Sequence, residues 1–275
     1  MTTSTQQQDA STTDSFISLR DVVFRHDTRN ILDGLNLDIA QGSVVAILGP
    51  SGVGKSTILK LITGQIRPVS GTITVNRQRV DQLSGTQLNR YRKTLGVMLQ
   101  NSALLTDMTV FENVALPVRE HTRLPEPVIR RLVLSKLQAV GLRGSIDMLP
   151  RELSGGMARR VALARALVLD PELVLYDEPF TGLDPIAAAT VSKLIRHVNE
   201  ALNVTSVVIT HDVDRMQGLI DCAHIMIGGK IAASGTPAQL AADETPMIRQ
   251  FMQGLADGPV PFHYPAPDLA EDLLQ

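Results

Sequence analysis

The sequence predicts an α/β fold with a parallel β-sheet core, an antiparallel strand region before it and an inserted helical region. A continuous apolar run at residues 43–48 is typical of a parallel strand buried on both faces, and a helical pattern follows at residues 55–63. Residues 101–169 contain several helical patterns and no convincing buried strand. Beyond them, two short apolar runs flank a helical segment and give a βαβ rhythm, at residues 173–176, 186–202 and 205–210.

Two stretches of alternating apolar and polar residues precede the core. They lie at residues 17–24 and 35–39, with turn-forming residues between them, and they predict antiparallel edge strands. In the inserted helical region, about residues 101–165, the clearest helices are expected at residues 126–140 and 155–168. We therefore expect one domain over residues 16–250.

The segments on either side of this domain differ from it in composition. Residues 1–15 are rich in Ser, Thr and Gln and predict a disordered tail. Residues 251–275 are rich in proline and also contain Phe262 and Tyr264, although disordered segments are usually poor in aromatic residues. We therefore expect a C-terminal extension that packs on its own domain or on a sister subunit.

The composition is that of an ordinary globular protein. A net charge of −2 over 275 residues offers no general surface for polyanions, so no nucleic-acid partner is expected. The single cysteine, Cys222, excludes an internal disulfide and indicates a reducing compartment. The first residues lack the pattern of a signal peptide, and no apolar run reaches the roughly 18 residues of a membrane span, so the chain is expected to be cytoplasmic.

A glycine-rich loop lies between the buried strand and its helix, and it matches G-x-x-x-x-G-K-[ST]. Glycines allow the backbone N–H groups to close on phosphates, and the helix N-terminus adds its dipole. Lys55 supplies a charge to the β- and γ-phosphates, and the Ser56 hydroxyl can coordinate Mg²⁺. The expected nucleoside triphosphate site comprises Gly49, Pro50, Ser51, Gly52, Val53, Gly54, Lys55, Ser56 and Thr57.

Two adjacent carboxylates, Asp177 and Glu178, end the apolar run at residues 173–176. Carboxylates are costly to bury at such a position unless they bind a metal or take part in chemistry. We assign Asp177 to Mg²⁺ and Glu178 to activation of the attacking water.

The segment Leu153-Ser154-Gly155-Gly156-Met157 resembles the signature motif of the ATP-binding cassette (ABC) family. Other motifs of the family follow in its order: Gln100 resembles the Q-loop glutamine, residues 182–184 the D-loop, and His211 the switch histidine. The resemblance implies a P-loop NTPase (RecA-like) core of ABC type, ATP hydrolysis with ATP and Mg²⁺ as cofactors, and a homodimer that closes two ATP sites head to tail.

The resemblance also implies roles for individual residues. Gln100 would contact Mg²⁺ and take part in catalysis, and His211 would be catalytic. Ser154, Gly155 and Gly156 would bind the nucleotide of a sister subunit. Two positions depart from the family pattern: Met157 replaces the usual glutamine, and the segment that normally stacks an aromatic ring on adenine offers His26.

Residues 100–122 and the closing segment at residues 258–265 resemble one subgroup more closely, the ATPases of maintenance-of-lipid-asymmetry (Mla) phospholipid transporters. That resemblance implies a peripheral protein on the cytoplasmic side of the bacterial inner membrane. Its expected partners are an integral-membrane permease, a STAS-domain cytoplasmic protein and a substrate-binding protein with a mammalian-cell-entry domain. The implied function is to drive phospholipid movement between the inner and outer membranes, which maintains outer-membrane lipid asymmetry.

Two other functions share part of this evidence. An ABC transporter for another small solute has the same chemistry and differs only in cargo. A soluble ABC-type mechanical ATPase is disfavoured, because such proteins typically join two ATPase units or carry basic regions.

The segment after Gln100 carries several apolar residues that allow two interpretations. They could form a permease-docking surface, or they could pack in the core of the helical insertion. The residues are Leu104, Leu105, Met108, Val110 and Phe111.

Overall fold

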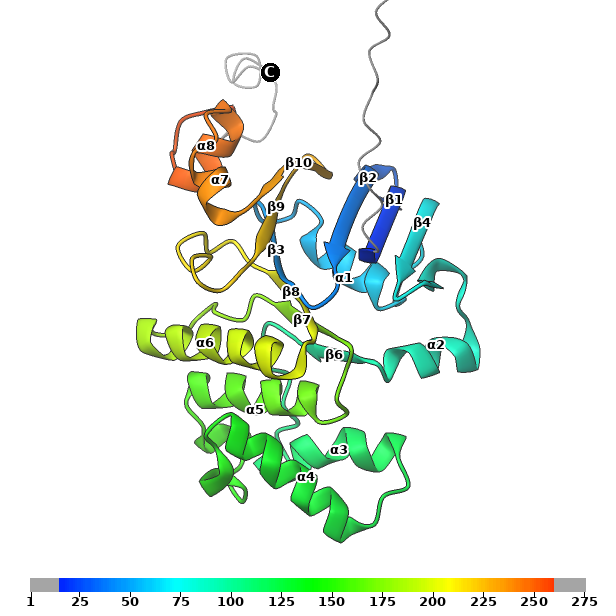
Figure 1. Cartoon of the computed structure of the whole chain (residues 1–275), viewed down its shortest axis with the longest axis vertical. Helices are drawn as coiled ribbons and strands as arrows, with labels where there is room; N and C mark the ends of the chain where they lie inside the picture. The colour runs from blue at the N-terminus through cyan, green and yellow to red at the C-terminus, as the bar shows by residue number, and fades with distance from the viewer. Residues whose placement is uncertain (1–14, 260–275) are drawn as a thin grey trace, which may run out of the picture.

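The structure is a computed structural model that describes residues 15–259 (Figure 1). The predicted tail over residues 1–14 and the aromatic residues Phe262 and Tyr264 lie outside the described residues, whereas Ser15 already belongs to the first strand. Within the described range, no helix has both the length and the apolar character required to cross a membrane.

An antiparallel sheet of four strands, in the order β2-β1-β4-β5, forms one end of the molecule. The predicted pair is longer than expected, because β1 (Ser15–His26) and β2 (Arg29–Ala40) continue to a two-residue turn. The sequence analysis missed β4 (Ser70–Val75) and the two-residue β5 (Gln78–Arg79). Alternate residues are buried along the second half of β2, as the pattern predicted, whereas bulges interrupt the alternation in β1.

The second sheet has six strands in the order β10-β9-β3-β8-β7-β6. All neighbours run parallel except β10, which pairs antiparallel with β9 at the edge. The expected strands are β3 (Val44–Leu48), β7 (Leu173–Asp177) and β8 (Thr205–Ile209). The strands that were not predicted are β6 (Leu95–Met98), β9 (Cys222–Ile227) and β10 (Lys230–Gly235).

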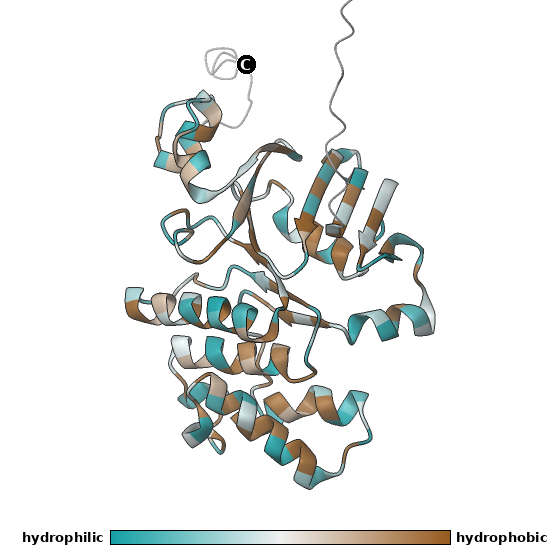
Figure 2. Cartoon of the chain, in the orientation of Figure 1, coloured by the Kyte–Doolittle hydropathy of each residue, from teal (hydrophilic) through white to brown (hydrophobic). Residues whose placement is uncertain are grey.

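The central strands separate two hydrophobic cores. Val45 and Ile47 of β3 face a core shared with α1 (Lys55–Ile62) and the antiparallel sheet. Val44 and Ala46 face the core on the other side, which contains the helices of the insertion. Because successive side chains of a strand point to opposite faces, a strand between two cores must be apolar throughout. The central strands and α1 are accordingly brown in Figure 2.

The helical region lies at the end of the long axis opposite the antiparallel sheet, where α3 and α4 pack below α5 (Figure 1). A capping box of Thr109 and Glu112 begins α3. The helices of the insertion are α3 (Val110–His121), α4 (Glu126–Ala139) and α5 (Gly155–Leu167), with 3₁₀ turns at Arg143–Ser145 and Pro150–Glu152. The remaining helices are α2 (Gly85–Arg92), α6 (Pro185–Leu202), α7 (Pro237–Ala241) and α8 (Pro246–Gln253), with a 3₁₀ turn at Val80–Gln82.

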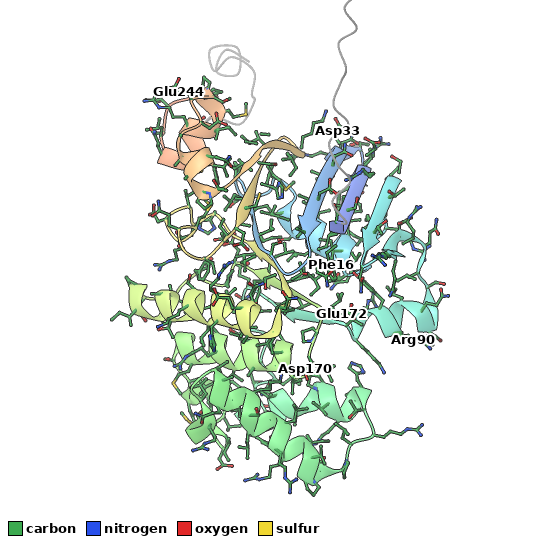
Figure 3. All side chains as sticks on the ribbon, viewed as in Figure 1. Phe16, Asp33, Arg90, Asp170, Glu172 and Glu244 are labelled. Carbon is green, nitrogen blue, oxygen red and sulfur yellow. The ribbon has the colours of Figure 1, made fainter. Side chains whose placement is uncertain are left out.

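Polar contacts link these parts at residues labelled in Figure 3. Asn76 donates to Glu172 at 2.8 Å, which joins the antiparallel sheet to the mixed sheet. Lys230 of β10 lies 3.3 Å from Asp33 of β2. Lys136 of α4 forms an ion pair with Asp170, which precedes β7, so the helical region is also tied to the core. The α/β fold class predicted from the sequence is confirmed.

Candidate nucleotide site

The glycine-rich loop connects β3 to α1 and requires glycine at position 54. Gly54 precedes the helix at φ 109°, and a Cβ there would lie 3.0 Å from Leu32 and 3.3 Å from the carbonyl oxygen of Ile31. The beginning of α1 has no side-chain cap. Its first N–H groups are therefore available to phosphate oxygens, as nucleotide binding at a helix N-terminus requires.

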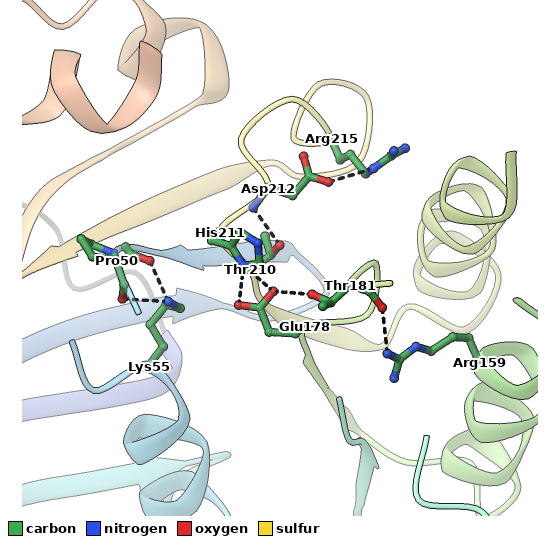
Figure 4. A network of polar contacts seen from close by, with 10 residues as sticks. Pro50, Lys55, Arg159, Glu178, Thr181, Thr210, His211, Asp212 and Arg215 are labelled. Atoms are coloured by element: carbon green, nitrogen blue, oxygen red, sulfur yellow. Dashed lines mark hydrogen bonds and ion pairs between the residues drawn. The ribbon is translucent and has the colours of Figure 1, made fainter. Parts of the chain in front are cut away.

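Lys55 is held at this loop by its own chain. It is only 7% exposed, and its ammonium donates to the carbonyl oxygens of Gly49 at 2.7 Å and Pro50 at 3.0 Å (Figure 4). Burial lowers the pKa of Lys55, while the nearby charges of Glu178 and Asp177 oppose that shift. The charge is therefore held in place where phosphates would lie.

Asp177 ends β7 and Glu178 follows it, beside the end of β8. Burial, and then the neighbouring charge of Glu178, raise the pKa of Asp177, whereas Lys55 and a hydrogen bond with Ser56 oppose the shift. The backbone N–H of Glu178 donates to Ile209 at 2.8 Å, and Glu178 has a positive φ of 47°. This left-handed conformation is uncommon for glutamate and directs its carboxylate away from the strand.

Two side chains hold the Glu178 carboxylate. The Nδ1 atom of His211 lies 3.0 Å from it, and the Thr181 hydroxyl donates to it at 3.2 Å (Figure 4). His211 lies two residues after the end of β8, and its side chain is 58% exposed. Glu178 is thus presented to the cavity between an exposed imidazole and a fixed hydroxyl.

A cavity of about 510 Å³ brings most of the predicted residues together. The predicted residues that line it are Ser51, Gly52, Gly54, Lys55, Ser56, Thr57, Gln100, Glu178 and His211. Gly49, Pro50, Val53 and Asp177 do not line it. Pro50 and Val53 lie on a neighbouring hollow, and Asp177 reaches the cavity through its bond with Ser56.

His26 and four residues without a predicted role complete the lining. These four are Phe24, Ile31, Lys60 and Ile66. Phe24 places an aromatic ring at the cavity two residues before His26, and both residues border the cavity. The apolar alternation of β1, continued by two residues beyond Val22, was the signal that could have identified Phe24.

The residues present suit a magnesium–nucleotide complex. Mg²⁺ prefers oxygen ligands, few of them from protein, together with substrate phosphates. Ser56 and Gln100 offer oxygen atoms at the cavity wall, and the Asp177 carboxylate bonds to Ser56 behind it.

The predicted signature residues do not line the cavity. Ser154 caps α5 by accepting from the N–H of Met157 at 3.2 Å, and Ser154 and Gly155 are exposed. A Cβ on Gly156 would lie 2.8 Å from the Cβ of Ala187, so this glycine also permits close packing of α5 on α6. Met157, at the position of the family's glutamine, is half-buried and packs against the helical core.

The D-loop residues precede α6. Asp184 caps that helix by accepting from the N–H groups of Ile186 and Ala187, both at 2.9 Å. Ile186, two residues further along the chain, is 80% exposed. The edge formed by residues 154–157 and 182–186, called the signature edge below, therefore combines two capped helix N-termini with exposed side chains.

The apolar residues after Gln100 divide between the two interpretations. Val110 is fully buried, and Leu104 and Phe111 pack against the helical core. Leu105 is 43% exposed, and the buried Asn113 fixes its backbone by accepting from its N–H at 2.8 Å and donating to its carbonyl at 3.1 Å. Among these residues, Leu105 is the one presented most clearly to a partner.

Comparison with known proteins gives the same class of site. The chain is 48% identical to the intermembrane phospholipid transport system ATP-binding protein MlaF of Haemophilus influenzae, over 95% of this chain and 99% of that protein. It is 40% identical to a probable ribonucleotide transport ATP-binding protein of Mycobacterium leprae, over 84% of this chain and 66% of that protein.

Solved structures agree in fold. The chain is similar to cbiO1 from Clostridium perfringens, with a TM-score of 0.78 and 31% identity, over 88% of this chain and 96% of that one. It is also similar to the ATP-binding cassette MJ0796, solved as a dimer bound to ADP and phosphate, with a TM-score of 0.73 and 29% identity, over 80% and 98% of the two chains.

The family model described as ABC transporter matches residues 32–181, which include the glycine-rich loop, the signature segment and both carboxylates of the site. The match spans more than half of the chain and includes most of the residues that line the cavity. The chain belongs to the ABC transporter family and is its ATP-hydrolysing subunit.

Proposed function

We propose that this ATPase powers a bacterial inner-membrane transporter that moves phospholipids between the inner and outer membranes and so maintains outer-membrane lipid asymmetry. The observation that carries the proposal is the 48% identity to MlaF, which extends over 95% of this chain. The protein would be peripheral, on the cytoplasmic side of the inner membrane. Its partners would be an integral-membrane permease, a STAS-domain protein and a substrate-binding protein with a mammalian-cell-entry domain.

Each residue of the cavity has a proposed part in hydrolysis. The loop amides and Lys55 bind the β- and γ-phosphates of ATP. Ser56, Asp177 and Gln100 hold Mg²⁺, which, when bound, neutralises charge on the phosphate oxygens. Glu178 accepts a proton from the attacking water, and the contact with His211 supports its orientation toward the γ-phosphate.

A homodimer would complete the site. Ser154, Gly155 and Gly156 lie outside the chain's own cavity, with two of them exposed, so they are free to bind the nucleotide of a sister subunit. The dimeric state of the related cassette MJ0796 supports this arrangement. Leu105 would contribute to the surface that meets the permease.

The C-terminal extension over residues 251–275 would strengthen that dimer or pack on its own domain. Phe251 at its beginning is half-buried against the core. Truncation after Gly254 is expected to weaken dimerisation, measured by sedimentation, and to leave ATP binding at Lys55 intact. An unchanged dimerisation constant would favour packing on the chain's own domain.

The catalytic assignment is tested by Glu178→Gln in the assembled transporter. The substitution keeps the size of the side chain and removes the proton acceptor, so kcat should fall by roughly 10²- to 10⁴-fold while ATP binding is kept. Glu172→Gln, on a carboxylate that bonds Asn76 far from the cavity, is the control. Hydrolysis at the wild-type rate by Glu178→Gln would show that another residue activates the water.

The cargo is tested with the same variant. Complexes purified with the chain should transfer a labelled phospholipid between vesicles with ATP, and the Glu178→Gln complex should not. The mycobacterial relative, named for ribonucleotide transport, supports another solute as the alternative cargo. Nucleotide uptake without lipid transfer would favour that alternative, and an ATPase that does not fractionate with membranes would contradict both.

A further inference from the structure

Arg159 lies in the second turn of α5, five residues after Ser154, and its side chain is buried. The residue is 7% exposed, and no ion pair is recorded for it within residues 15–259. Burial lowers the pKa of the guanidinium. A charge buried without a carboxylate is costly, and an apolar side chain of similar size would pack there at lower cost. The contacts of Arg159 therefore call for an explanation beyond packing.

The guanidinium of Arg159 bonds two backbone segments that are far apart in sequence. Its Nη1 donates to the carbonyl oxygen of Leu99 at 3.1 Å, and its Nη2 donates to the carbonyl oxygen of Thr181 at 3.1 Å. Leu99 directly precedes Gln100 on the cavity wall. The planar fork of arginine presents N–H donors on two separate nitrogen atoms, so one side chain can reach carbonyl oxygens that lie on two different segments.

Thr181 connects this contact to the carboxylate of the site. Its hydroxyl donates to Glu178, which in turn meets His211, so a continuous series of contacts runs from α5 to the cavity (Figure 4). The same helix begins at the exposed Ser154 and Gly155. One guanidinium thus joins the helix of the signature segment to the loops of both Gln100 and Glu178.

We infer that Arg159 is a positioning residue for ATP hydrolysis, which holds the Gln100 loop and the Glu178 loop at fixed places relative to the signature helix. The inference rests on the proposed roles of Gln100 and Glu178. The two carbonyls that the Arg159 guanidinium bonds belong to Leu99 and Thr181, which have no proposed part in nucleotide binding, so Arg159 acts on the rate of the chemical step and not on ATP affinity.

Two other arginines of α5 provide matched controls. Arg165 donates to the carbonyl oxygens of Ser102 and Ala103, so it holds the chain after Gln100 without reaching Thr181. Arg160 donates to Val140 and joins α5 only to the end of α4. Both are half-buried, and comparison of the three separates loss of an α5 arginine that bonds backbone carbonyls from loss of the link to Glu178.

The test is Arg159→Met in the full-length chain assembled in its transporter. Methionine keeps much of the apolar stem and removes both donors, so kcat should fall roughly 10- to 100-fold, because misplacement of reacting groups by about 1 Å has effects of this order. KM for ATP and the Kd of MgATP should change by less than about twofold. Arg160→Met should keep the wild-type kcat, and Arg165→Met should give a smaller loss than Arg159→Met.

A double-mutant cycle distinguishes positioning from general destabilisation. Thr181→Val removes the hydroxyl that contacts Glu178. If Arg159 acts through Thr181, adding Arg159→Met to Thr181→Val should cost much less kcat than Arg159→Met costs in the wild type. Additive losses of kcat would show that Arg159 does not act through Thr181. If Arg159→Met does not fold, Arg159→Lys replaces it, and the inference requires kcat to fall with unchanged Kd, since the one nitrogen of lysine cannot take the places of both Nη1 and Nη2.

The inference about Arg159 fails, and the proposed role of Glu178 stands, if Arg159→Met hydrolyses ATP like Arg160→Met while Glu178→Gln is inactive. It also fails if the Arg159 and Arg160 variants lose kcat in proportion to equal losses of thermal stability. If instead Glu178→Gln hydrolyses ATP at the wild-type rate, the proposed catalytic assignment is wrong, and the inference built on it is overturned with it.

Discussion

The nucleotide cavity and the signature edge are both built at the N-terminus of a helix, and they differ in how that terminus is completed. At α1 the preceding Gly54 provides no side-chain cap, and a buried Lys55 stands beside the free amides. At α5 the Ser154 hydroxyl caps the helix and the neighbouring Gly155 is exposed. The first terminus leaves donors for a ligand inside its own chain, whereas the second is already capped and, in the proposed dimer, would meet its ligand across the interface.

The largest effect on nucleotide binding is expected at the cavity, from Lys55→Ala. Loss of a charge-assisted contact to phosphates should weaken MgATP binding by roughly 10- to 100-fold. Because burial disfavours the charged amine, the nucleotide-free protein should lose little stability. Lys230→Ala, at a surface ion pair, is the control for both calorimetric titration and thermal unfolding. Unchanged MgATP affinity in Lys55→Ala would show that the N-terminus of α1 does not bind the nucleotide in the way proposed, and the contrast with the N-terminus of α5 would be lost.

Gly155→Asp tests the signature edge. A Cβ on Gly155 would be 3.5 Å from Leu183, an ordinary contact, so this position is preferable to the tightly packed Gly156. The isolated chain should still bind ATP, whereas turnover in the dimer should fall by about 100-fold, because a carboxylate would face the γ-phosphate. The exposed Gly144→Asp is the control.

Mixed dimers sharpen that experiment. A Lys55→Ala chain paired with a Gly155→Asp chain places both defects in one composite site and leaves the other intact. Mixing the two inactive proteins should therefore restore activity at no more than one of the two sites. Steady turnover by a strict monomer would show that the signature edge is not needed.

A pH effect should arise at the cavity through Asp177. Burial and the charge of Glu178 raise its pKa, so the charged form destabilises the folded state above that pKa. Asp177→Asn should accordingly raise the melting temperature at pH 7, with the difference shrinking as pH falls through the raised pKa. Mg²⁺ binding should weaken over the same range, above the pH expected for an ordinary aspartate, about 3.9. A melting temperature independent of this substitution would contradict the assignment.

The smallest effect on stability is expected from Leu105→Asp. The side chain is 43% exposed, so the free energy of unfolding should change by about 0.5 kcal/mol or less. Co-purification of the permease should nevertheless weaken. Val110→Asp is the contrasting variant, because a carboxylate at a fully buried position should cost several kcal/mol. If Leu105→Asp keeps the permease bound and ATPase activity normal, docking occurs elsewhere.

The sequence predicted most of the cavity because its residues follow contiguous patterns. Lys55 and the carboxylates each end or begin an element whose apolar run is unmistakable, and Gln100 and His211 follow from the order of family motifs. Strand β6 escaped detection because it is four residues long and contains Gly96, where a Cβ would lie 2.5 Å from the backbone of α5. Its glycine serves close packing, which no local pattern reveals.

Arg159 illustrates a different limit. In the sequence it is one of several arginines on a helix, and it looks no different from Arg160. Its partners Leu99 and Thr181 are separated from it by 60 and 22 positions. Every residue has a backbone carbonyl, so the sequence does not indicate which carbonyls accept a hydrogen bond from a distant arginine. Only the packed structure identifies the arginine that bonds two of them.

The left-handed backbone at Glu178 has a consequence for how such a fold is maintained. A non-glycine residue in this conformation costs on the order of 1 to 3 kcal/mol, and glycine at 178 would relieve that cost and the repulsion from Asp177. Selection for thermal robustness alone would therefore remove the carboxylate. Glu178 therefore lowers the stability of the fold and is retained for turnover. The most heat-resistant variants of a random library should accordingly include inactive proteins altered at this single position.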